Sequence, residues 1–140
     1  MKRSESGSAT IEALIGVLAF GPLILIVIFA GRNAAAHQAV ESAAADAARS
    51  ASIARTAQAA KNDAESATQA SLSSQELDCL DIDVTVDTSQ FRRPAGQPAT
   101  VNVTVSCRLD LSDLSVPGIP GNRVVRESVS SAIDTWRQRK

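Results

Sequence analysis

The chain contains an apolar run of twenty residues, Ile11 to Ala30, whose one charged residue is Glu12. An α-helix of roughly 20 residues covers about 30 Å, the thickness of the hydrocarbon core of a bilayer. We therefore expect residues 8–31 to form a hydrophobic membrane helix. Carboxylates inside membrane segments are costly and usually functional, so Glu12 is a candidate functional residue. The alternative is that Glu12 lies at headgroup depth.

Gly21 and Pro22 interrupt this run, and Pro22 is expected to kink the helix because it lacks a backbone N–H. Two basic residues, Lys2 and Arg3, precede the run, whereas a single basic residue follows closely after it. This asymmetry favours a cytoplasmic N-terminus and an external C-terminal part. An uncleaved signal anchor and an ordinary signal peptide, cut near Ala36, are the alternatives. The length disfavours a signal peptide, whose apolar core normally spans about 7–15 residues.

Composition argues against several classes of function. The formal net charge is -1, which provides no basic field for nucleic acid. With three Phe, one Trp and no Tyr, the chain has few rigid aromatic side chains for a ligand pocket. The Ser residues lack a matching His/Asp constellation, so we predict no enzyme and no cofactor. His37 is the one histidine and has no ligand cluster at metal-site spacing, so we predict no metal site.

Residues 32–75 are rich in alanine. Asn33 to Ser71 holds seventeen Ala in thirty-nine residues and contains neither Gly nor Pro. Alanine has the highest helix propensity, so we expect this stretch to continue the membrane helix outward as a long rod. Its apolar side is slight and consists of small residues near helical spacing: Val40, Ala44, Ala47, Ala51, Ala54 and Ile53. A sheet is the expected partner of this face.

Two segments of residues 76–140 alternate between apolar and polar residues, as half-buried strands do. The apolar positions of the first are Leu80, Ile82, Val84 and Val86; those of the second, within Thr100–Leu111, are Val101, Val103, Val105, Cys107, Leu109 and Leu111. The turn-forming stretch Ser89–Pro98 lies between them. We predict an antiparallel pair of strands.

Cys79 and Cys107 are the only cysteines, and outside the cytoplasm such a pair is expected to form a disulfide. Loop entropy makes it worth roughly 3–4 kcal/mol. Direct opposition of the two cysteines would place apolar residues across from acidic ones. Matching the apolar faces instead pairs Leu80 with Cys107 and Ile82 with Val105. Cys79 would then lie just outside the ladder, or a β-bulge would bring it in.

The remainder of the chain is expected to add one strand. The breakers of Leu111–Asn122 predict a loop. Arg123–Trp136 has apolar residues spaced by four, which also fits a helix, but its Val, Ser and Thr content favours a strand. The acidic residues near the first strand lack a calcium loop and are expected on the solvated face of the sheet. These residues are Asp78, Asp81, Asp83 and Asp87.

The segment GSATIEALIGVLAFGPLILIVIFAGR, residues 7–32, resembles the start of TadE-like proteins, the pseudopilins of tight-adherence (Flp-type) pilus systems. The resemblance implies cleavage by a prepilin peptidase between Gly7 and Ser8, which places Glu12 at the fifth mature position. Family members usually carry an aromatic residue after this Glu, whereas Ala13 follows here. Glu12 would neutralise the new amine of Ser8 on a neighbouring subunit, because a buried ion pair costs less than either charge alone.

We therefore predict a pilin-like α+β fold: one long N-terminal helix, half in the membrane, packed through its Ala-rich outer half on a small three-stranded antiparallel sheet. The expected division is a leader over 1–7, a membrane helix over 8–31, its continuation over 32–75 and a β domain over 76–140. The expected function is that of a minor pseudopilin in the cytoplasmic membrane. Its implied partners are the prepilin peptidase, other pilins, the membrane assembly platform and the lipid bilayer. The alternative is an anchored or secreted binding or adhesion module with no pilus role.

Overall fold

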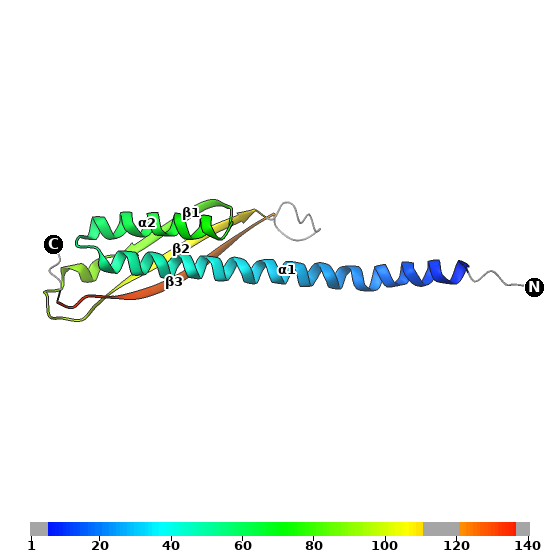
Figure 1. The fold of residues 1–140 in the computed structure, drawn as a ribbon, viewed down its shortest axis with the longest axis horizontal. Helices are drawn as coiled ribbons and strands as arrows, with labels where there is room; N and C mark the ends of the chain where they lie inside the picture. The colour runs from blue at the N-terminus through cyan, green and yellow to red at the C-terminus, as the bar shows by residue number, and fades with distance from the viewer. Residues whose placement is uncertain (1–5, 111–120, 137–140) are drawn as a thin grey trace, which may run out of the picture. The chain divides into compact units, whose positions relative to one another are not determined.

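The computed structural model describes residues 6–110 and 121–136, with side chains from Ile11 onward. The elements are the helices α1 (Ser6–Ile53) and α2 (Ala57–Ser74), the 3-10 turn η1 (Ser89–Arg92), and three strands (Figure 1). The strands are β1 (Cys79–Asp87), β2 (Ala99–Asp110) and β3 (Asn122–Ile133). The expected loop over Leu111–Asn122 falls largely on residues 111–120, which lie outside the described residues. The predicted α+β class, with a three-stranded antiparallel sheet, is confirmed.

The Ala-rich region forms two helices, so the single rod predicted over Asn33–Ser71 is wrong. The first helix ends at Ile53 and the second begins at Ala57. Thr56 caps the second helix, and its Oγ1 accepts a hydrogen bond from the N–H of Ala59 at 3.1 Å. The two helices run antiparallel, because Ser71 Oγ donates to Asp46 Oδ2 at 2.9 Å and Gln75, the C-cap residue of α2, donates to the carbonyl of Ala39, earlier in α1, at 3.4 Å.

The break has a physical reason, because it lets a second apolar stripe reach the core. Every fourth residue of α2 from Ala60 to Leu72 is buried: Ala60, Ala64, Thr68 and Leu72. A straight rod would leave this stripe in water, and packing outweighs helix propensity in such cases. The predicted stripe of α1 is buried except for Ile53, which is 63% exposed at the end of the helix.

Contacts divide the chain into two compact units, residues 1–35 and residues 36–140. The core of the second unit lies between the two helices and one face of the sheet. Small residues of α1 and α2 pack there against the alternate residues of β2 and against Phe91. The inward positions of β2 are Ala99, Val101, Val103, Val105, Cys107 and Leu109. Because alanine side chains are short, the helix backbone approaches the sheet closely, which suits a core with few large residues.

The sheet order is β1-β2-β3, and both strand pairs are antiparallel. Ile82 lies opposite Cys107 and Val84 opposite Val105. The predicted pairing of Leu80 with Cys107 is therefore wrong by two residues. The ladder also has a bulge between Cys79 and Asp81, the second of the two arrangements considered from the sequence. The bulge leaves Leu80 60% exposed. The third segment is a strand, as predicted.

Candidate assembly helix

The first part of α1 exposes an apolar surface on every side. From Ile11 to Ile28, twelve large apolar side chains are each at least 45% exposed. A helix that is apolar all round belongs in the interior of a bundle or in a membrane. Within the described part of the chain, α1 is the one helix long and apolar enough to cross a bilayer. It is therefore a candidate membrane span.

Glu12 is exposed within this surface and lies one residue into the apolar run. Its position on α1 fixes its relation to the predicted cleavage site. Gly7 and Ser8 lie in the first turn of the helix, which begins at Ser6. Ser8 is four residues before Glu12, so the two lie on the same helix face, about 6 Å apart along the axis.

Three residues of this segment lack bulk or a backbone donor. A Cβ added at Gly16 or at Gly21 would meet nothing within 4 Å, so both positions present open helix surface. The helix continues through Pro22, which removes the backbone hydrogen bond that the carbonyl of Leu18 would otherwise accept. The kink at Gly21 and Pro22 stays a prediction.

The disulfide between Cys79 and Cys107 is present, which confirms the prediction. The S–S distance is 2.02 Å and the Cα atoms are 5.5 Å apart. Cys107 is completely buried, whereas Cys79 is partly buried at the bulge where α2 gives way to β1. The bond therefore ties the start of β1 to the central strand at the point where the regular ladder is interrupted.

Sequence reasoning missed one contact that joins α1 to the sheet. His37 Nδ1 lies 2.8 Å from Glu127 Oε1 on β3, and the two side chains are 42% and 30% exposed. Ninety positions separate these residues, so no local pattern could indicate the pair. Among the described residues, no group of three His, Cys, Asp or Glu side chains is placed to hold a metal ion.

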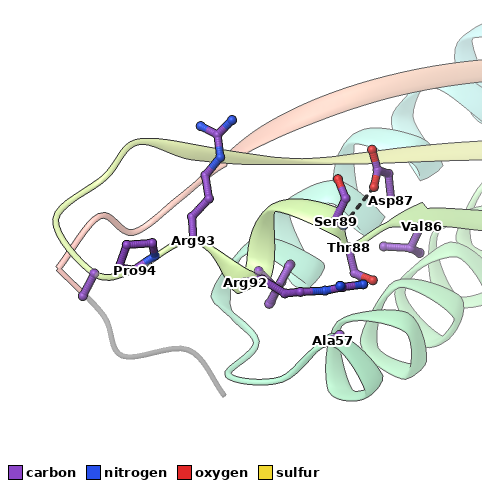
Figure 2. Close-up of a pocket in the computed structure, with 10 residues that line it drawn as sticks. Ala57, Val86, Asp87, Thr88, Ser89, Arg92, Arg93 and Pro94 are labelled. Atoms are coloured by element: carbon purple, nitrogen blue, oxygen red, sulfur yellow. Dashed lines mark hydrogen bonds between the residues drawn. The ribbon is translucent and has the colours of Figure 1, made fainter.

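A hollow lies where the β1–β2 connection meets the start of α2 (Figure 2). It measures about 810 Å³ and is lined by Ala57 and by residues 86–89 and 91–95. The N–H of Ser89 donates to Asp87 at 2.9 Å, and this hydrogen bond lowers the pKa of the Asp87 carboxyl below its ordinary value. The side chain of Arg93 points away from the hollow, and its Nη1 donates to the carbonyl of Pro98 at 3.0 Å.

Comparison with known proteins bears on the helix. The family model described as TadE-like protein matches residues 7–49. No curated protein and no solved structure matches the chain. The matched range begins at Gly7, includes Glu12 and the whole exposed apolar run, and ends four residues before the end of α1. The N-terminal third of the chain is therefore similar to TadE-like proteins, as predicted.

Proposed function

We propose that the protein is a minor pseudopilin that a prepilin peptidase processes and that takes part in the assembly or initiation of a tight-adherence type pilus. One observation carries the proposal: the exposed apolar helix with its single carboxylate falls within the range matched by the TadE-like family model. Such a surface must be covered by lipid or by other helices. Lipid would cover it before assembly, and the helices of other subunits would cover it afterwards.

Cleavage between Gly7 and Ser8 would make Ser8 the new N-terminal residue and give it a charged amine. Glu12 of a neighbouring subunit would supply the counter-charge. A lone charge in an apolar bundle is very costly, so the pair selects the axial register at which the two charges meet. Gly16 and Gly21 would allow neighbouring helices to approach closely, since small residues permit close contact between membrane helices.

The proposed topology places the N-terminus in the cytoplasm and residues 36–140 outside. The disulfide supports an external position for this unit, because disulfides persist in oxidising compartments. The partners would be the prepilin peptidase, other pilins and the membrane assembly platform. In this role the protein is a structural subunit rather than a catalyst.

The intact mass of the protein purified from its native membrane tests the processing step. We expect the mass of the chain that begins at Ser8. An uncut chain would mean a plain membrane anchor, and a chain that begins near His37 would mean ordinary secretion. Either of these masses refutes the proposal in favour of an anchored or secreted binding module.

The role of Glu12 is tested separately by Glu12→Ala, with Glu12→Asp as the matched control that keeps the charge. We expect Glu12→Ala to abolish incorporation into pili while cleavage after Gly7 continues. Glu12→Asp should retain part of the incorporation. Normal incorporation of Glu12→Ala would remove Glu12 from the proposed pairing.

A further inference from the structure

The sheet has two open edges in the described part of the chain. Because the order is β1-β2-β3, β1 and β3 each have a hydrogen-bonded neighbour strand on one side only. These edge strands are nine and twelve residues long. An exposed edge offers backbone groups for pairing with another strand, and proteins control such pairing with charged side chains. The charges on the two edges therefore bear on what the edges contact.

The β1 edge is acidic. Between Glu76 and Asp87 the chain has five acidic residues and no basic one. A groove of about 270 Å³ follows this edge between α2 and β1, and it is lined by Glu65, Gln69, Ile82, Asp83 and Val84. The Asp83 carboxylate lies on the outer face of the strand, opposite to Val84, and its Oδ2 accepts a hydrogen bond from Thr85 Oγ1 at 3.3 Å. Charged groups of this kind accept a guanidinium well, since its fork of N–H donors matches carboxylate geometry.

The β3 edge has the opposite charge. Arg123 and Arg126 are exposed on it. Its one acidic residue within the strand, Glu127, is engaged by His37 at 2.8 Å. Arg126 Nε donates to Ser106 Oγ at 3.1 Å, which directs the guanidinium along the outer face of the sheet and leaves its two terminal nitrogens available. Among the described residues of this strand, two guanidinium groups outnumber one carboxylate, so the edge is positively charged.

The register places these opposite charges at the same height. Asp83 pairs with Ser106, and Ser106 pairs with Arg126, so all three lie in one row across the sheet. Because both strand pairs are antiparallel, β1 and β3 run in the same direction. A copy of the chain displaced sideways, without rotation, would therefore bring its β3 beside β1 of the first copy as a parallel neighbour, with Arg126 level with Asp83.

We propose that a second copy of this chain docks its β3 edge against β1, with its Arg126 beside Asp83 on the outer face of the sheet. Charge complementarity selects this pairing, because two β1 edges or two β3 edges would bring like charges together. The inference rests on the proposed function in one respect: helices anchored in a single membrane give both copies the same orientation.

Cross-linking between two differently tagged full-length chains in the same membrane tests this contact without altering the charges. Thr85 and Ser128 occupy the next row on the same face of the sheet as Asp83 and Arg126, and Thr104 lies between them. One chain carries Thr85→Cys and the other Ser128→Cys, and a short bismaleimide joins them. The native cysteines are bonded to each other and do not react. The control replaces Thr85→Cys by Thr104→Cys, which is on the central strand. We expect cross-linked heterodimer from the first pair, several-fold above the control.

Charge reversal then tests the contribution of the ion pair. Arg126→Glu in the chain with Ser128→Cys should reduce the cross-link to the control level, and Asp83→Arg in the other chain should restore it. Hydrogen-exchange protection of β2 verifies that each variant is folded. A yield equal to the control, a predominance of Thr85→Cys homodimers, or no restoration by the reciprocal reversal would each overturn the inference. If the chain is nevertheless cut after Gly7, the proposed function stands without this contact.

Discussion

Removal of the disulfide should lower the free energy of unfolding of the unit formed by residues 36–140 substantially. The bond joins Cys79 to Cys107 across 28 positions. For a loop of that size, the chain-entropy relation gives about 3.6 kcal/mol at 25 °C. Domains of this size have a free energy of unfolding of roughly 5–15 kcal/mol, so the bond supplies a large fraction of it.

The stability of residues 36–140 should be measured in the full-length chain by a local method, because the apolar first part of α1 contributes its own signal to a melting curve. Hydrogen exchange of the β2 amides serves this purpose, since these amides lie in the central strand and exchange through opening of the whole unit. A loss of 3.6 kcal/mol corresponds to a fall in protection of about 400-fold. The double variant Cys79→Ala and Cys107→Ala should show this fall.

Reduction of the wild-type protein provides the internal comparison. A reductant should lower β2 protection in the wild type to nearly the level of the double variant, and it should have no effect on that variant. Each alanine also removes a sulfur atom, and Cys107 is fully buried, so the variant is expected to be slightly less protected than the reduced wild type. Protection that changes by less than about tenfold, a free-energy change near 1.4 kcal/mol, would refute the loop-entropy account.

Three further substitutions, each measured by hydrogen exchange, test the core packing, the cap of α2 and the contact between His37 and Glu127. Ala47→Leu inserts bulk at a fully buried position and should cost about 1–3 kcal/mol, whereas Ala70→Leu on the exposed side of α2 should change stability by less than about 0.5 kcal/mol. Thr56→Ala removes the cap of α2 and should cost about 1 kcal/mol, and Thr56→Ser should restore most of it. Glu127→Gln should cost at most about 1 kcal/mol in β3 protection, because the pair with His37 is partly exposed; a larger loss would mean that the pair is a main attachment of α1 to the sheet.

Much of the sheet could be predicted because its period is strict. Alternation identified the strands containing Val84 and Val105 and assigned the inward face of β2 correctly, whereas Leu80 and Ile82 of β1 are 60% and 38% exposed. The predicted register was wrong by two residues, and the bulge adds one unpaired residue at the start of the ladder. A shift of two residues keeps every side chain on the same face, so burial patterns alone cannot detect it.

The break between the helices was harder to predict, although one local signal was present. Ala54, Arg55 and Thr56 contain no Gly or Pro, and the flanking alanines favour a helix throughout. Thr56 is a good N-cap residue, and the stripe of α2 that follows it repeats every four residues from Ala60. Together these features indicate a new helix, but their effect depends on the sheet that both helices cover.

The arrangement of charge on the sheet shows why surface function is difficult to infer from sequence order. Along the chain, Asp81, Asp83 and Asp87 have the alternation expected of a solvated face, and Arg126 belongs to a mixed segment that also fits a helix. The sheet order separates them to opposite edges, and the register aligns Arg126 with Asp83 across Ser106. Isolated exposed charges contribute little to the stability of one subunit. Opposite charge on two edges at the same height instead favours an ordered contact between subunits over pairing of identical edges. The proposed contact with a second copy therefore explains the placement of these charges better than the solubility of a single copy does.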